Sequence, residues 1–429
     1  MWLNENLVRR MYVSTIVACL LTINVTAQQD KPVELQQPED PHAHQTEHED
    51  SHPSGNWHFM HDGVAFLTVN HQTTPRGATE FVSQNWWMGM GSRSVGNSTL
   101  TLKGMLSGEP ATMRGNGYSE LFQTGEVYKG QPITDHQHPH DFVMQLAAVW
   151  YRPLSTRTGI TVAGGPVGEA TLGPVAFMHR QSAVENPFAP LGHHTFDATH
   201  YVKGIVAMRV DHGPFALEGS VFHGGEPDEH RWGILDVGAL NSWATRAWWQ
   251  PDPHWSVQVS HGFLTKPEAL EPGNVRRTTV SAAWHTQSET GFTAVTAAYG
   301  RNDKDHADVG SDALFVEATH RVASHVVYSR VEAVDVETNL LLGTQQHGGH
   351  LEPSTVLAAT FGVMQDLPAL GNFDFSVGAD VTLHRAPEQL IGIYGSRPTS
   401  FKVFLRLRLP VPAMGRMRDA TMMQPSGRM

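Results

Sequence analysis

The chain has 429 residues, 26 histidines, one cysteine and a formal net charge of −12 at neutral pH. This length suits either two ordinary domains or one large all-β barrel. The acidic balance argues against nucleic acid as a partner, and a single cysteine excludes both a disulfide framework and a thiolate metal site. Cations are therefore the more natural ligands.

The N-terminus has the layout of a secretory signal peptide. A short segment ending in Arg9 and Arg10 precedes an apolar run over 12–25, and the small residue Ala27 comes just before the polar Gln28. The run is too short to be a spanning helix, so residues 1–27 are predicted to be a cleaved signal peptide for export. Lipidation of Cys19 is the alternative, which is disfavoured because the apolar run continues beyond it.

Residues 28–56 are polar, contain several prolines and have almost no large apolar side chains. Such a segment cannot bury enough surface to offset the entropy of ordering, so we predict a disordered periplasmic tail. Neutral imidazole binds Cu(II) and Zn(II), and a flexible histidine-rich tract can wrap around such an ion. The tail is therefore either a metal-gathering segment or a solvated linker. Its candidate ligands are His42, His44, His48 and His52.

From Trp57 onward, apolar and polar residues alternate in segments of about 9 to 11 residues, the length of a membrane-spanning strand. Over 373–384 the odd positions are apolar and the even positions are small or polar, and over 401–409 only Phe404 breaks the rule. No later run is long enough for a spanning helix. Residues 57–409 are therefore predicted to form an antiparallel up-and-down transmembrane β-barrel of roughly 14 to 18 strands, followed by a flexible C-terminal tail over 410–429.

Residues 108–199 alternate less clearly and are rich in glycine, proline, histidine and acidic residues. Strands are still expected at Tyr118–Tyr128, Phe142–Arg152 and Gly159–Gly164. The rest, especially 165–199, has the composition of a long ordered loop. In a barrel, such a loop either folds into the lumen or covers one mouth.

Two groups of residues in this region are candidate metal ligands. His136, His138 and His140 project to one side of an extended chain, so two of the three imidazoles can converge on one ion after a bend at Pro139. Asp135 and Asp141 flank them and could orient the rings, although a simple polar turn is the alternative. The second group contains His193 and His194, with His200 nearby. The two groups are expected to meet inside the lumen, where such residues either select charged solutes or form structural ion pairs.

Enzyme chemistry finds little support in the sequence. The motifs of α/β-hydrolases, zinc proteases and nucleotide-binding loops are absent. A hydrolase built on a barrel needs a serine and a histidine on one strand face, whereas Ser260 and His261 are neighbours that point to opposite faces.

The order of signal peptide, histidine-rich and acid-rich tail, and barrel resembles the outer-membrane copper-resistance protein B family. The segment 135–141 is also similar to envelope proteins encoded near metal-efflux systems. This resemblance implies an outer-membrane protein for metal sequestration or export, with periplasmic efflux components as partners. The tail of that family is typically rich in methionine repeats, but here no methionine lies between Met11 and Met60. The departure favours a divalent ion that prefers imidazole over Cu(I).

The sequence therefore predicts an outer-membrane barrel, in contact with lipid, that binds or passes Cu(II) or Zn(II) in metal resistance or efflux. The first alternative is a general porin-like channel for small solutes in which the histidines are incidental. The second alternative is a hydrolase on a barrel scaffold.

Overall fold

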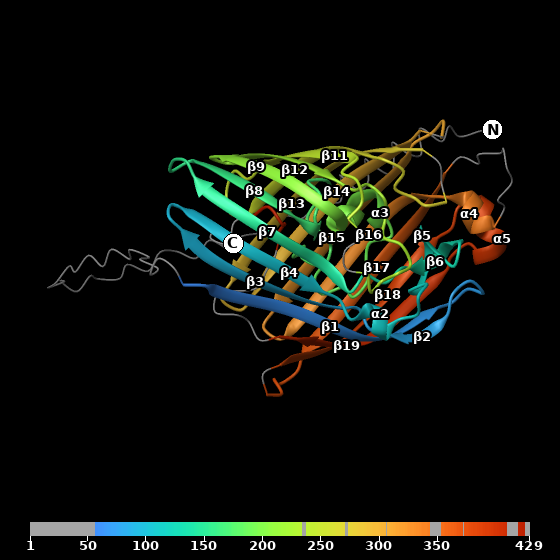
Figure 1. The fold of residues 1–429 in the computed structure, drawn as a ribbon. Coiled ribbons are helices and arrows are strands. Elements are labelled where there is room, and N and C mark those ends of the chain that lie inside the picture. The colour runs from blue at the N-terminus through green and yellow to red at the C-terminus, as the bar shows by residue number, and fades with distance from the viewer. Residues whose placement is uncertain are drawn as a thin grey trace. The chain divides into compact units, whose positions relative to one another are not determined.

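A computed structural model describes residues 56–233, 237–270, 273–305, 307–343, 353–371, 373–409 and 419–424. The predicted signal peptide and nearly all of the predicted tail, including its four candidate ligands, lie outside these ranges. No helix among the described residues is long and apolar enough to cross a membrane. The structure consists mainly of long antiparallel strands (Figure 1).

The strands form one closed barrel wall. The sheet contains 17 strands, and two of them, β2 and β3, pair with successive parts of β1 and so occupy a single position. Since β1 also pairs with β19, the wall closes with 16 strand positions, within the predicted number. The wall strands are β1 (His58–Gln72), β2 (Thr79–Val82), β3 (Asn85–Val95), β4 (Ser98–Leu106), β7 (Val143–Pro153), β8 (Thr158–Gly168), β9 (Val202–His212), β10 (Phe215–Phe222), β11 (Ser242–Trp249), β12 (Trp255–Leu264), β13 (Val275–Ser288), β14 (Gly291–Lys304), β15 (Ser311–Val322), β16 (His325–Val336), β17 (Ser354–Asp366), β18 (Asp374–Arg385) and β19 (Thr399–Arg408).

The wall has its apolar side chains outside and its polar side chains inside. On β19, Phe401 and Val403 are 46% and 51% exposed, whereas the intervening Lys402 is 3% exposed. The same alternation runs along β18, as predicted. Ser260 on β12 is buried and its neighbour His261 is exposed, so these two side chains do lie on opposite faces.

Phe404 faces the lumen because a glycine leaves room for its ring. Its cross-strand partner on β18 is Gly378, and a Cβ added there would collide with the Phe404 ring. Inside the barrel the ring packs edge-on against Phe66, with ring centroids 5.7 Å apart. The one exception to the predicted alternation is therefore a cross-strand packing arrangement.

Short turns and long connections lie at opposite ends of the strands. The short turns include residues 96–97, 213–214, 289–290 and 323–324. In the first of these, Gly96 adopts a φ of +57°, which glycine reaches without strain. The longest connections between wall strands are residues 107–142 and 169–201.

These two connections fold into the barrel, and we call them the first and second inward segments. Every residue from 169 to 193 is buried, and side chains of the second segment bond to inward-facing residues on β10, β15 and β19. The second segment of the region that the sequence placed either in the lumen or over a mouth is thus inside, whereas residues 143–153 and 158–168 of that region are wall strands and residues 129–131 of the first segment are exposed. The strand predicted over 118–128 is present, but it pairs only with β6 in a separate two-stranded sheet and is not part of the wall. The inward segments contain β5 (Tyr118–Tyr128), β6 (Gln131–Gln137), α2 (Glu109–Thr112), α3 (His193–Phe196) and the 3-10 turn η1 (Ala198–His200); α4 (Thr338–Leu342), η2 (Glu388–Leu390) and α5 (Ile391–Tyr394) lie in other connections.

Part of the predicted flexible C-terminal tail is docked inside the barrel, which corrects that prediction. Met422 and Met423 are each 1% exposed and belong to a buried apolar cluster that includes Val149 on β7, Ala163 on β8 and Leu172 of the second inward segment. The backbone carbonyls of Thr421 and Met422 accept hydrogen bonds from Lys103 on β4, at 3.2 and 3.0 Å. Apolar burial and these bonds together offset the entropy of ordering residues 419–424.

Candidate functional site

The second inward segment is fixed by charged groups that the wall presents to it. Arg180 is 1% exposed; its Nε donates to Glu317 on β15 at 2.5 Å and its Nη1 donates to Asp197 at 3.0 Å. Glu317 also accepts from Arg330 on β16 at 2.9 Å. The buried arginine therefore links the inward segment to two neighbouring wall strands.

A second anchor lies at Glu185. Its carboxylate accepts a hydrogen bond from Arg321 at 2.9 Å, pairs with Arg406, and lies 3.8 Å from a guanidinium nitrogen of Arg408. One buried carboxylate thus faces three arginines from β15 and β19. A lone charge buried here would be strongly unfavourable, so the sequence places the opposite charges around it.

Five histidines gather inside the barrel, and we call them the histidine cluster. They are His138 and His140 from the first inward segment and His193, His194 and His200 from the second. Ring centroids are 5.3 Å apart for His140–His200 and His193–His200, and 5.4 Å apart for His138–His194 and His193–His194. Two inward segments that are distant in sequence therefore place their imidazoles around one small volume.

Each of four rings in the cluster is oriented by an oxygen at its Nδ1. The acceptors are Glu109 for His140 at 2.9 Å, Glu226 for His194 at 3.4 Å, the Asp197 carboxylate for His193 at 2.7 Å, and the Asp197 carbonyl for His200 at 2.7 Å. A proton on Nδ1 leaves Nε2 with a free lone pair. The Nε2 atoms of His140, His194 and His200 are buried and have no hydrogen-bond partner among the described residues.

The fifth ring, His138, contacts a carboxylate through the other nitrogen. Its Nε2 lies 3.1 Å from Glu126, and Arg231 bridges Glu126 to Asp141. The five histidines, Glu126, Asp141 and Arg231 together line a cavity of about 40 Å³.

Burial and neighbouring carboxylates shift the rings of the cluster in opposite directions. Burial holds the pKa of His138 and that of His200 well below the usual range, and the nearby Arg231 lowers the pKa of His138 further. Burial also acts on His140 and His194, but Glu109 and Glu226 outweigh it and raise the pKa of these two rings. Burial would raise the pKa of Asp197, but the hydrogen bond and charge of His193 and the charge of Arg180 hold it well below its ordinary value. A neutral imidazole with a free Nε2 can bind a proton or a metal ion.

The structure separates the predicted ligands into two sets. His138, His140, His193 and His194 are in the cluster. His136 instead contacts the backbone oxygen of Thr134 at 3.1 Å.

The two predicted aspartates bond to arginine and tyrosine side chains. Asp135 accepts bonds from Arg76 at 2.7 Å and Tyr394 at 2.8 Å. Asp141 accepts from Tyr201 at 2.7 Å and pairs with Arg231. Neither carboxylate has a hydrogen bond to a ring of the cluster, although Asp141 lines the same cavity as the five histidines. Each lies beside an arginine or tyrosine that satisfies its oxygens.

No family model matches the chain, and no curated protein matches it. Among solved structures, the chain is similar to OprB of Pseudomonas putida, with 10% identity and a TM-score of 0.53 over 82% of this chain and 94% of that one. The anion-selective porin of Comamonas acidovorans and OmpF of Salmonella typhi are also similar, each with 10% identity and a TM-score of 0.47 over 82% of this chain, and over 100% and 97% of their own. The likeness to OprB shows a shared barrel fold.

Sequence reasoning did not assign several residues of the site. His200 lies near the second predicted group but is not among its predicted ligands, and the sequence pattern does not identify Glu109, Glu126, Asp197 or Glu226. Their roles depend on which segments meet inside the barrel. The only signal along the chain is the spacing of His193 and Asp197, four residues apart across one short helical turn.

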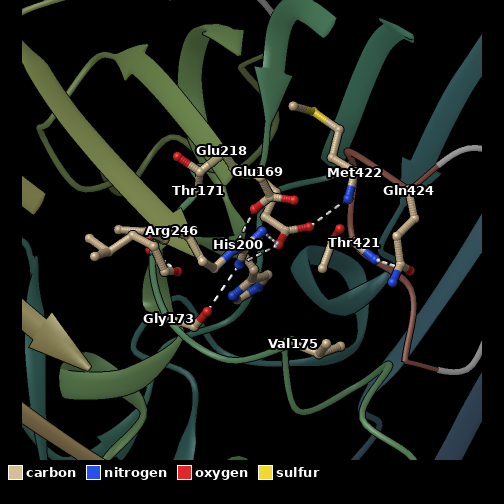
Figure 2. Close-up of polar contacts among 12 residues, drawn as sticks. Glu169, Thr171, Gly173, Val175, His200, Glu218, Arg246, Thr421, Met422 and Gln424 are labelled. Carbon is tan, nitrogen blue, oxygen red and sulfur yellow. Dashed lines mark hydrogen bonds and ion pairs between the residues drawn. The ribbon is translucent and has the colours of Figure 1, made fainter. Parts of the chain in front are cut away.

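Beside the cluster, Glu169 joins the docked C-terminal residues to the wall. Its carboxylate accepts a hydrogen bond from the backbone N–H of Met422 at 2.8 Å and lies 3.5 Å from Arg246 on β11. Figure 2 shows Glu169 between these two partners, with His200 close by. Arg246 also pairs with Glu218 at 2.7 Å, so one network connects two wall strands, an inward segment and the C-terminal residues.

A buried carboxyl in the first inward segment predicts a pH effect on stability. Burial raises the pKa of Glu120 to about 8, against an ordinary value of 4.5, although Lys402 opposes the shift. The folded protein therefore retains a proton that the unfolded chain releases, and the free energy of unfolding falls as pH rises between these two values. Glu120→Gln removes this titration. We expect the variant to gain stability over the wild type by up to about 1.4 kcal/mol per pH unit in that range.

Urea unfolding in lipid vesicles between pH 5 and 9 measures this difference. The matched control is Glu388→Gln, the same change on an exposed side chain. Parallel pH profiles for Glu120→Gln and the wild type would show that Glu120 is not protonated in the folded barrel.

Proposed function

We propose that the chain is an outer-membrane barrel through which small polar or charged solutes cross along a narrow path. The observation that carries the proposal is the polarity of the wall, which is apolar outside and charged inside, the reverse of a water-soluble protein. Large apolar side chains such as Val403 and Leu405 face outward, while Lys402, Arg406 and Arg408 face inward and are buried. Exposed apolar side chains on the exterior suit lipid, and a charged interior suits water and polar solutes.

The inward segments make the path narrow. Five cavities that the described residues line have volumes of about 20 to 60 Å³. Each has room for only a few water molecules. We therefore expect hydrated ions and small solutes to cross, with a conductance far below that of a 16-stranded barrel with an open lumen.

Planar-bilayer recording of the refolded protein tests this proposal. The wild type should insert and carry a small, steady current. Val403→Arg places a charge on the lipid face, which costs about 2–4 kcal/mol near the bilayer midplane, so this variant should insert poorly. Lys402→Arg is the matched control, because it keeps an inward charge on the adjacent position and should insert normally. Absence of current from well-inserted wild-type protein would contradict the proposal.

Metal ions are a second and narrower candidate for the solute. The sequence favoured divalent copper or zinc, with general small solutes as the alternative. The barrel fold supports passage of small solutes in general. The histidine cluster is the observation that favours metal ions.

A further inference from the structure

We propose that the histidine cluster binds one divalent transition-metal ion, of the kind represented by Zn²⁺ and Cu²⁺, through imidazole Nε2 atoms. The proposal deepens the proposed function, because it names the class of solute that the lumen holds. The first ligands are His140, His194 and His200, and His138 and His193 complete the surroundings of the ion.

The spacing of the rings fits imidazoles that share an ion. With a metal–nitrogen distance of roughly 2 Å and tetrahedral angles, two imidazole centroids lie roughly 5 Å apart. The centroid distances in the cluster are 5.3 Å for His140–His200 and 5.4 Å for His193–His194. Among the proposed first ligands, His140 and His200 therefore already have a separation close to that of imidazoles sharing an ion, while His194 lies at this separation from His138 and His193.

The second argument is that buried nitrogens have no partner. A buried polar atom left without a hydrogen bond costs about 1–3 kcal/mol, so a purely structural cluster would be expected to satisfy its Nε2 atoms. Here the Nε2 atoms of His140, His194 and His200 have no partner among the described residues, although each Nδ1 has one. This is the arrangement of metal-binding histidines, whose second nitrogen is held by a carboxylate or carbonyl.

The charge around the cavity suits a cation. Glu109, Glu226 and Asp197 hold rings of the cluster, and Glu126 lies beside His138. Two arginines also line the cavity: Arg231, which is shared between Glu126 and Asp141, and Arg277. The four carboxylates around the rings outnumber these two arginines.

Binding requires a small inward movement of the rings. In the part of the chain that the structure describes, no group of three or more His, Cys, Asp or Glu side chains is already arranged as a metal site. The cavity of about 40 Å³ that the five rings line provides the space into which they can rotate. Rotation about the side-chain bonds leaves the backbone of both inward segments in place.

Isothermal calorimetry with ZnCl₂ on the refolded full barrel is the first test. The wild type should bind one Zn²⁺ at this site, and the triple variant His140→Ala, His194→Ala, His200→Ala should lose that binding. Glu109→Gln keeps every ligand but weakens the orientation of His140, so its affinity should fall roughly 10–100-fold.

Two controls separate this site from other histidines and from misfolding. The triple variant His212→Ala, His261→Ala, His320→Ala removes three exposed histidines of the barrel and should bind as the wild type does. A variant with His42, His44, His48 and His52 changed to alanine should also retain the site. Faster electrophoretic migration before boiling shows that each variant has formed its barrel, and the triple glutamine variant replaces the alanine one if the latter fails to fold.

Electron paramagnetic resonance with Cu²⁺ supplies a readout that a structural role would not produce. The wild-type spectrum should show hyperfine splitting from several imidazole nitrogens, and the cluster variant should lose it. Equal metal binding by folded wild-type and cluster-variant barrels would overturn the inference. If the wild type carries current in the bilayer but binds no Zn²⁺ in calorimetry, only the metal site is overturned. If it binds Zn²⁺ but carries no current, only the proposed passage is overturned.

Discussion

Replacing Arg180 with alanine is expected to release the second inward segment from the wall. The change leaves Asp197 and Glu317 buried with fewer opposite charges, and breaking a buried ion pair in this way costs about 3–5 kcal/mol. Amide hydrogen exchange over 176–197 should therefore accelerate by more than about a hundredfold, at 1.4 kcal/mol per factor of ten.

Arg301→Ala is the matched control for Arg180→Ala. Arg301 also pairs with two carboxylates, those of Asp303 and Asp312, but its side chain is 38% exposed. A partly exposed pair contributes about 0–1 kcal/mol, so exchange in the inward segment should stay at the wild-type rate. Similar exchange rates in both variants would mean that Arg180 does not anchor the segment.

Removing residues 410–429 is expected to raise the single-channel conductance several-fold. The truncation takes away the docked residues 419–424, whose backbone bonds to Lys103 and Glu169. It exposes these two charged side chains to the lumen and empties the space that Met422 and Met423 fill. Wider space and additional accessible charge both favour ion flow.

Removal of residues 425–429 alone is the matched control for that truncation, because it leaves 419–424 in the chain. Its conductance should equal that of the wild type in the same bilayer recording. If the longer truncation also left the conductance unchanged, the docked residues would not obstruct the path.

The wall was largely predictable from the sequence because its signal is local. Alternation over 373–384 and 401–409 follows from the pleat of a strand with lipid on one side and a polar lumen on the other. Even the exception at Phe404 lies in a strand, β19, that the alternation places correctly along the chain. Its cause, the glycine at 378 on the neighbouring strand, depends on register, which alternation does not define.

The lumen was less predictable because its contents depend on contacts between distant segments. The sequence indicated that the groups at 135–141 and 193–194 would meet, and the structure places His138 within 5.4 Å of His194 between ring centroids. The sequence did not distinguish His138 from His136, because the hairpin of β5 and β6 determines which rings reach the cluster. Docking of 419–424 also had no local signal, since its partners Lys103 and Glu169 are more than two hundred residues away.

A planar-bilayer recording with Zn²⁺ in the bath tests most directly whether solutes cross the lumen past the histidine cluster. The wild-type current should fall when Zn²⁺ is added and recover when a chelator removes it. The variant that lacks His140, His194 and His200 should conduct but show no such block. A wild-type current that stays constant at Zn²⁺ concentrations that saturate the calorimetric site would contradict a path through the cluster.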